Sequence, residues 1–342
     1  MLSVSNVTTP WAHGQQPESE AIASNSDIAK SHDTIPDEEE SLVDFARRMT
    51  KELLDKSGVT LVTDTPAQYH ALDARTRAEA ATWDLTGHAP EHVEKTLHCS
   101  VMYTAWSYPH GHLDAQLVIA CIVFWILCID DYTVPVAALS AFAPRLQTGA
   151  KQLHPGLDVL AALLARTRAV LNPYAATACT VDVLNYVNST LHEHHLADMP
   201  LARAARRYPL YKRTRNGINE ICAGFVWDAF TFPDVATHIQ AFPDAILFIA
   251  LTNDVLTFYK EELAGDTRNF VHDEARVTGR SPRAVVAGTV DAVVDTIRAG
   301  RAVLSGAERD AWDSFVAGYI SFSVLTPRYR VAGLAERGVG EL

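Results

Sequence analysis

Three oxygen-bearing side chains recur at intervals of four residues about three quarters of the way along the chain. Asn253, Thr257 and Glu261 would share one face of a helix. Amide, hydroxyl and carboxylate oxygens are hard ligands of the kind that Mg²⁺ prefers. The wholly apolar run 245–251 predicts that the same helix carries these groups out of a buried core. The alternative is an ordinary helix that becomes polar where it reaches the surface.

A second acidic element follows another apolar run. Asp130 and Asp131 come directly after residues 115–129, and Pro135 favours the end of the helix there. Adjacent acids at a helix C-terminus meet the negative end of the helix dipole and risk desolvation, and a divalent cation relieves both problems. Taken alone, this pair is also compatible with an exposed acidic loop.

Basic residues supply the complementary charge. Lys212 and Arg213 lie in a basic run that continues to Asn216 and Gly217, and Arg328 with Tyr329 forms a second group near the C-terminus. Arginine grips phosphate with a planar fork of donors. Each cluster alone is compatible with a solvated helix end. Two magnesium elements and two basic elements together predict a pocket mouth that neutralises a diphosphate.

Composition limits the class of protein. The 342 residues are 48% hydrophobic and 20% charged, which is typical of a globular chain with a large core. The net charge of −12 argues against a nucleic-acid partner. The five cysteines are odd in number and lack metal-binding spacing, so we expect reduced core thiols. The longest charge-free stretch, 115–129, is shorter than a membrane span, so we expect a buried core helix and no span.

The pattern along the chain predicts a single all-α domain. Residues 1–36 are polar and aperiodic, which indicates a disordered N-terminal tail, and residues 37–342 form the α-helical domain. No secretory signal is recognisable in the first 40 residues, so we expect a cytoplasmic protein. After a first helix from Asp37, the predicted helices are 67–84, 90–106, 112–131, 135–144, 156–171, 175–193, 200–206, 209–229, 237–262, 282–304 and 308–325.

These elements together resemble a class I terpene synthase of the fungal trichodiene synthase family. The run 253–261 is similar to the family's Asn/Asp-Asp-x-x-Ser/Thr-x-x-x-Glu metal triad, and Asp130-Asp131 takes the place of its aspartate-rich motif. The resemblance spans roughly 40–335 and implies a helical bundle that encloses an apolar active-site cavity. One departure is that Thr133 and Val134 stand where the family usually has a further acid.

The resemblance also implies roles for the site residues. It implies three Mg²⁺ ions, with Asp130 bridging two of them and Asp131 supporting. It implies that the diphosphate of a small isoprenoid substrate meets the cations and that aromatic faces line the pocket. The residues expected at the diphosphate are Arg213, Lys260, Arg328 and Tyr329, with Asn216 and Gly217 as linker and effector. The expected substrate-lining aromatics are Phe124, Tyr319 and Phe322, with Trp125 as a further candidate; core packing is the alternative for each.

The resemblance therefore implies Mg²⁺-dependent ionisation of farnesyl diphosphate and cyclisation to a fifteen-carbon terpene, and it implies a homodimer. Other substrate lengths and a linear or water-quenched alcohol stay open. A chain-elongating prenyl diphosphate synthase should carry two Asp-Asp-x-x-Asp motifs, which the 253–261 triad does not match. A non-catalytic helical scaffold is the alternative from another class. The histidine-rich run 192–195 lacks metal-binding spacing and is assigned no role.

Overall fold

A computed structural model describes residues 40–131 and 133–326, and within these ranges the ordered elements are helices without any β-strand. The all-α prediction is confirmed. The α-helices are α1 Leu42–Ser57, α2 Tyr69–Ala80, α3 Pro90–Ser107, α4 Leu113–Asp130, α5 Val136–Thr148, α6 Pro155–Arg166, α7 Pro173–His195, α8 Tyr208–Arg213, α9 Asn219–Val226, α10 Phe242–Ala264, α11 Phe270–Thr278, α12 Pro282–Val303 and α13 Gly306–Leu325. Short 3-10 turns lie at Thr167–Ala169, Val235–Thr237 and Ile239–Ala241. Residues 1–39 lie outside the described ranges, so the predicted tail stays a prediction.

Two helix predictions are wrong and one helix was missed. The segment 200–206 is not helical, because its alanines and arginines favour helix locally but offer no apolar stripe to bury. The predicted helix 209–229 is two helices, α8 and α9, separated by residues 214–218. Helix α11 was not predicted, although Asn269 caps its start by accepting a hydrogen bond from the backbone N–H of His272 at 3.0 Å.

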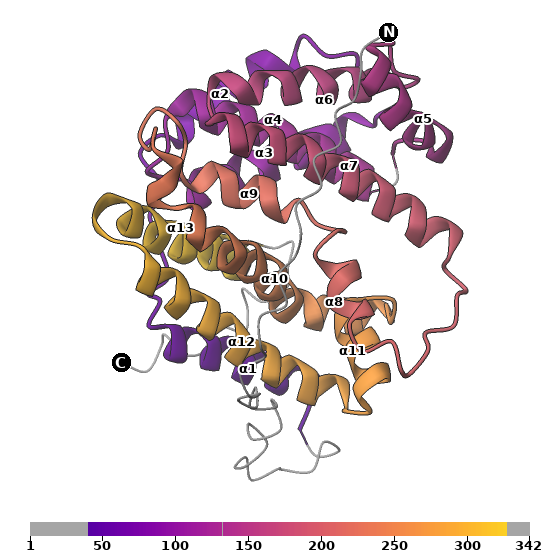
Figure 1. The fold of residues 1–342 in the computed structure, drawn as a ribbon, viewed down its shortest axis with the longest axis vertical. Helices are drawn as coiled ribbons and strands as arrows, with labels where there is room; N and C mark the ends of the chain where they lie inside the picture. Colours follow the sequence, from indigo (N-terminus) through magenta and orange to yellow (C-terminus); the bar gives the residue numbers. More distant parts are fainter. Residues whose placement is uncertain (1–39, 132, 327–342) are drawn as a thin grey trace, which may run out of the picture. The chain divides into compact units, whose positions relative to one another are not determined.

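The core is built around α4 and α10. In Figure 1, α2 to α7 lie together above, α1, α10, α12 and α13 lie below, and α9 runs between the two groups. Helix α4 packs on α2, α3 and α6, and α10 packs on α1, α9 and α12. Both helices are apolar on nearly every face because they are surrounded by other helices. Their polar C-terminal ends lie where the two helices leave the core, with Asp130 exposed and Glu261 half-buried.

Two segments of the described chain are long and apolar enough to cross a membrane by length and composition. They are Leu113–Asp130, of which 78% is buried in the fold, and Ile239–Ala264, in which 72% of the most apolar 18-residue window is buried. The first is longer than the 115–129 stretch considered from the sequence, but its burial agrees with the predicted core helix. Core helices pass such a test as readily as membrane spans. The cysteines are free thiols, and all but Cys99 are buried.

Candidate active site

A cavity of about 380 Å³ lies among α3, α4, α7, α8, α9, α10, α11 and α13. It collects side chains from segments that are far apart in the sequence. Ten of the predicted site residues line it: Asp130, Arg213, Asn216, Gly217, Asn253, Thr257, Lys260, Glu261, Tyr319 and Phe322. The magnesium triad, the first acid, the basic run and two aromatics are thus brought to one place.

Of the predicted residues that the structure describes, Phe124 and Asp131 do not join this group. Phe124 does not line the cavity, because its ring is fully buried and packs 5.2 Å from Trp83 and 5.1 Å from Trp125, centroid to centroid. Asp131 is absent from the lining; its Oδ2 lies 4.0 Å from His92 Nε2. Arg328 and Tyr329 lie outside the described residues.

The triad residues share one face of α10, as their spacing predicts, but they have different partners. Asn253 Oδ1 accepts a hydrogen bond from Arg213 at 3.2 Å, and Glu261 Oε2 accepts one from Asn269 at 2.8 Å. Burial raises the pKa of Glu261, while the nearby Thr257 hydroxyl and Lys260 oppose that rise. The Thr257 oxygen is buried and makes no hydrogen bond of normal geometry with the described residues.

These features fit a divalent cation. A buried carboxylate whose pKa is raised by desolvation is stabilised by a nearby positive ion. A buried hydroxyl oxygen without a partner carries a desolvation cost that coordination removes. Asn253 and Glu261 each keep an acceptor site beyond the single hydrogen bond described. The donor set consists of oxygen atoms, which suits Mg²⁺.

Arg213 makes four hydrogen bonds, three of them to the triad helix α10. It donates to Asp254 Oδ2 at 2.8 Å, to the Ala250 carbonyl at 2.8 Å and to Asn216 Oδ1 at 3.0 Å, besides its bond to Asn253. Burial raises the pKa of Asp254 to about 6, and the Arg213 guanidinium opposes that rise. Burial lowers the pKa of Arg213, but the Asp254 carboxylate outweighs this effect. The two side chains therefore form a buried, charged pair that ties α8 to α10.

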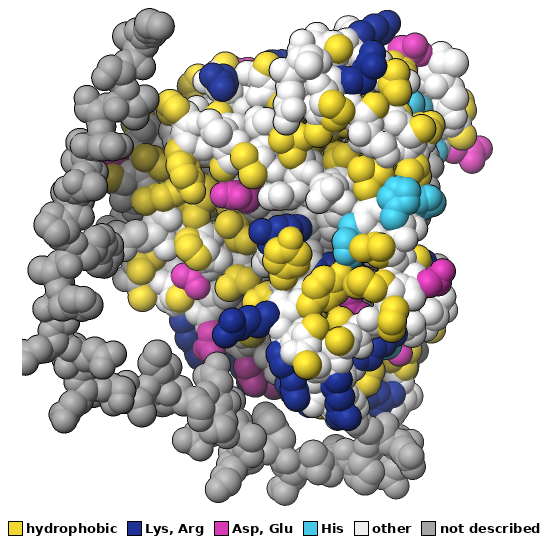
Figure 2. Space-filling view, turned by 45° about the vertical axis from the view of Figure 1, so that its right-hand side comes forward, with side chains coloured by type: hydrophobic (Ala, Val, Ile, Leu, Met, Phe, Trp, Pro, Cys, Tyr) yellow, Lys and Arg dark blue, Asp and Glu magenta, His cyan; other side chains and the backbone are white. Residues whose placement is uncertain are grey.

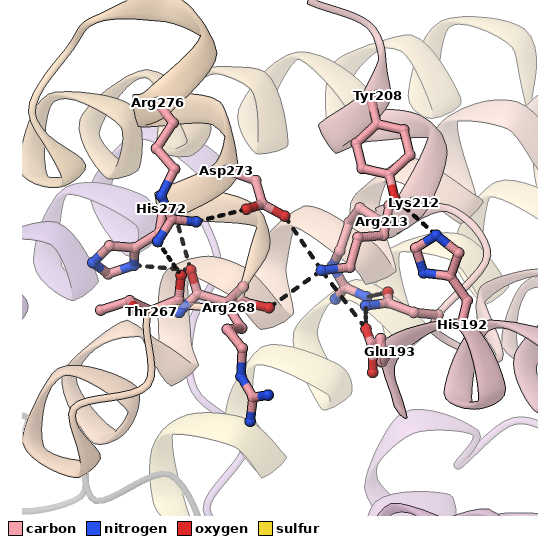
Figure 3. A network of polar contacts seen from close by, with 12 residues as sticks. His192, Glu193, Tyr208, Lys212, Arg213, Thr267, Arg268, His272, Asp273 and Arg276 are labelled. Carbon is pink, nitrogen blue, oxygen red and sulfur yellow. Dashed lines mark hydrogen bonds and ion pairs between the residues drawn. The ribbon is translucent and has the colours of Figure 1, made fainter. Parts of the chain in front are cut away.

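Lys212 braces the same segment from the other side. Figure 3 shows its ammonium between Asp273 of α11 and the backbone carbonyl of Arg268, each at 3.3 Å, with Glu193 of α7 at 3.9 Å. Glu193 also accepts a hydrogen bond from Asn216 Nδ2 at 3.1 Å. The irregular segment between α8 and α9 is thus held by α7, α10 and α11. These contacts depend on the break between α8 and α9, which the prediction of one continuous helix 209–229 did not include.

Two cations that line the cavity are not neutralised in this way. The ammonium of Lys260 and the guanidinium of Arg268 make no hydrogen bond or ion pair with other side chains in the part of the chain that the structure describes. Figure 3 shows the Arg268 guanidinium pointing away from the Lys212 contacts. Figure 2 shows that Lys and Arg side chains gather mainly in the lower half of one face, although the chain carries a net charge of −12. An anion could therefore find local positive charge.

The sequence reasoning missed Arg268 and several supporting residues. Asp254 stands inside the triad motif, and Glu193, Asp266 and Asn269 also line the cavity. Arg268 could have been found from the run 266–269, where a basic residue and a helix-capping Asn directly follow the triad helix. Asn269 both caps α11 and positions Glu261, so one residue links the local fold to the site.

The other wall of the cavity is aromatic and apolar. The Tyr103 ring meets those of Tyr319 and Phe322 edge to face, with centroids 6.0 and 5.4 Å apart. The Tyr103 hydroxyl donates to Cys222 Sγ at 3.0 Å, and that of Tyr319 donates to the Ile249 carbonyl at 3.2 Å. Because these hydroxyls are engaged by the protein, the rings are held in place. Aromatic faces attract positive charge.

Comparison with known proteins identifies the family and the fold that this chain resembles. A family model described as "Trichodiene synthase (TRI5)" matches residues 67–340. Terpene synthase 29 of Postia placenta is 30% identical over 298 residues, which cover 86% of each chain. Monoterpene synthase 25 of the same fungus is 30% identical over 312 residues, 89% of this chain and 92% of that one. A crystal structure of hedycaryol synthase in complex with nerolidol has a similar fold, with a TM-score of 0.59 and 17% identity over 78% of this chain and 97% of that chain.

Proposed function

The chain belongs to the trichodiene synthase family, and on that premise we propose that it is a Mg²⁺-dependent sesquiterpene synthase that converts farnesyl diphosphate to a cyclic fifteen-carbon terpene. The observation that carries this proposal is the shared cavity. The α10 triad and Asp130 meet two unneutralised cations at one end and an aromatic wall at the other. Such a cavity suits a substrate with an anionic head and an apolar tail.

The chemistry follows from that polarity. The carbon–oxygen bond to the diphosphate breaks, both electrons stay on the leaving oxygen, and an allylic cation remains. Bound Mg²⁺ supplies positive charge that stabilises the leaving diphosphate. Lys260 and Arg268 bind and orient the same group, and their charges add to that stabilisation. No proton transfer is needed for this step.

The aromatic wall acts after ionisation. Tyr103, Tyr319 and Phe322 present rings to the cavity, and each cation–aromatic contact contributes about 0.5–2 kcal/mol. The apolar lining also excludes water, which would otherwise capture the cation as an alcohol. Loss of a proton from the cyclised cation, or capture by one water, completes the reaction.

A ten-carbon substrate is the second candidate. It is favoured by the likeness to Monoterpene synthase 25, while the neighbouring hedycaryol synthase holds nerolidol, a fifteen-carbon alcohol. The cavity volume of about 380 Å³ is at the lower end of the roughly 300–1,000 Å³ of small-molecule sites. The number of magnesium ions, a homodimeric state and a cytosolic location stay predictions.

The test is incubation of the purified protein with geranyl, farnesyl and geranylgeranyl diphosphate, with and without Mg²⁺, followed by gas chromatography and mass spectrometry. We expect a cyclic fifteen-carbon product from farnesyl diphosphate that requires Mg²⁺. Farnesol or nerolidol as the sole product would show that water captures the cation before it cyclises. Products from geranyl diphosphate alone would establish the ten-carbon candidate. No product from any substrate would contradict the proposal and favour a non-catalytic helical protein.

A further inference from the structure

A second cluster of ligand-type side chains lies outside the cavity. His88 precedes α3, His92 lies in the first turn of α3, and Cys128 lies in the last turn of α4. One ligand atom from each lies within 4.8 Å of the others. The two imidazole rings stack with centroids 6.4 Å apart and an interplanar angle of 16°. Residues from two helices therefore converge on one point.

The histidines lack hydrogen-bond partners that burial demands. Both ring nitrogens of His88 and Nε2 of His92 are buried and make no hydrogen bond within the described ranges. A buried polar atom left without a partner costs about 1–3 kcal/mol. Burial, with the neighbouring His154 and His92, also lowers the pKa of His88, so the ring is neutral near pH 7. Neutral imidazole is the form that binds a metal ion.

Asp131 lies beside the group, next to His92. Its Oδ2 lies 4.0 Å from His92 Nε2, and the side chain is about one third exposed. The adjacent Asp130 lines the cavity, whereas Asp131 does not. The two adjacent acids of one predicted motif therefore lie in different surroundings. A simple His–Asp ion pair would satisfy one nitrogen of His92 but neither nitrogen of His88.

We propose that His88, His92, Cys128 and Asp131 form a zinc site separate from the magnesium triad. Imidazole and thiolate are borderline or soft ligands that favour Zn²⁺, whereas Mg²⁺ takes oxygen ligands. Binding breaks the S–H bond of Cys128, forms a Zn–S bond and releases the proton to solvent.

The geometry requires only a small adjustment. Tetrahedral zinc, with Zn–N near 2.0 Å and Zn–S near 2.3 Å, places ligand atoms roughly 3.3–3.6 Å apart. The limit of 4.8 Å holds for His88, His92 and Cys128, and it leaves an inward movement of about an ångström that side-chain rotation of the two half-buried histidines can supply. The Asp131 carboxylate, 4.0 Å from His92 Nε2, would have to turn toward the same point. The ion would join the start of α3 to the end of α4. It would thereby fix the end of α4, which carries Asp130. This inference does not rest on the proposed function.

The test uses the purified full chain, free of any polyhistidine tag, titrated with Co²⁺ as a spectroscopic substitute for Zn²⁺. We expect one equivalent to bind, with a thiolate-to-cobalt charge-transfer band that Zn²⁺ abolishes by displacement. Cys128→Ser should lose that band, and His88→Gln and His92→Ala should each weaken binding at least tenfold. Excess Mg²⁺ should not compete.

Matched variants separate this site from the others. Replacement of the exposed histidines His194 and His195 by Ala should leave the band unchanged, and so should Glu261→Gln in the magnesium triad. Thermal unfolding without metal checks that Cys128→Ser folds; if it does not, His88→Gln provides the same test at a less buried position. A wild-type protein without the thiolate band, or a band that persists in Cys128→Ser, would overturn the proposal.

Discussion

At the scale of single residues, the arginines of the site divide by how their charge is used. Arg213 is buried and donates hydrogen bonds to Asp254, Asn216, Asn253 and a backbone carbonyl. Arg268 lines the same cavity with a guanidinium that is not paired among the described residues. A group already saturated by the protein positions its neighbours, whereas an unpaired one can bind an anionic ligand. Arg213 therefore organises the site and Arg268 is expected to meet the diphosphate.

Replacement of Arg268 by Gln tests this division. The change removes one charge-assisted contact worth about 1.5–3 kcal/mol, so kcat/KM for the diphosphate substrate should fall about ten- to a hundredfold. Arg276→Gln is the control, because Arg276 pairs with Asp273 and the Thr267 carbonyl and does not line the cavity. Steady-state kinetics decide the matter. Equal losses in the two variants, or none in Arg268→Gln, would refute the assignment.

At the scale of elements, the break between α8 and α9 shows where sequence reasoning stopped. The row Asn253, Thr257 and Glu261 was predictable because its spacing is set by the helix itself. The start of α9 was not, because its cap comes from α7: Asp182 accepts hydrogen bonds from the backbone N–H groups of Glu220 and Ile221 at 2.9 and 3.0 Å. Such a cap from a distant helix leaves no local signal.

Asp182 also illustrates the cost of that arrangement. Burial raises its pKa to about 7, against the effect of the two backbone hydrogen bonds. The carboxyl therefore caps α9 at a desolvation cost that the two hydrogen bonds offset in part. Contacts with distant helices also explain why Phe124 does not line the cavity whereas Tyr103 does. The neighbours of a buried helix decide which of its faces meets the cavity.

The crossing of α3 and α13 gives a test of the fold. A Cβ on Gly318 would lie 1.7 Å from the backbone oxygen of Trp106, so the two helices approach as closely as they do only because this position is glycine. Gly318→Ala should lower the free energy of unfolding by about 1–3 kcal/mol or more. Urea unfolding followed by circular dichroism measures the change.

Gly224 of α9 is the matched control. An added Cβ there would meet Ala175 at 3.6 Å, an ordinary contact, so the better helix propensity of alanine should leave stability unchanged or raised by up to about 1 kcal/mol. If Gly318→Ala were as stable as Gly224→Ala, the close packing of α3 on α13 would be wrong. Since α13 carries Tyr319 and Phe322, that result would also displace the aromatic wall.

At the scale of the whole molecule, an acidic chain has to attract a substrate that is itself anionic. There are 41 acidic against 29 basic residues, yet the cavity gathers Lys260 and Arg268 beside the acids of α4 and α10. On the proposed function, metal ions held by these acids would offset their negative charge toward the anionic substrate. The sequence motifs predicted this pairing, whereas the shape of the cavity depends on contacts among eight helices and was not readable from them.

The most direct test of this account is the release of inorganic diphosphate from farnesyl diphosphate, measured with and without Mg²⁺ for the wild type, Glu261→Gln and Glu262→Gln. Glu261 lines the cavity, whereas its neighbour Glu262 pairs with His272 at 3.2 Å and does not. We predict release that requires Mg²⁺, falls about a hundredfold in Glu261→Gln and stays near the wild-type rate in Glu262→Gln. Release without metal, or equal rates in the two variants, would contradict the assignment of the triad.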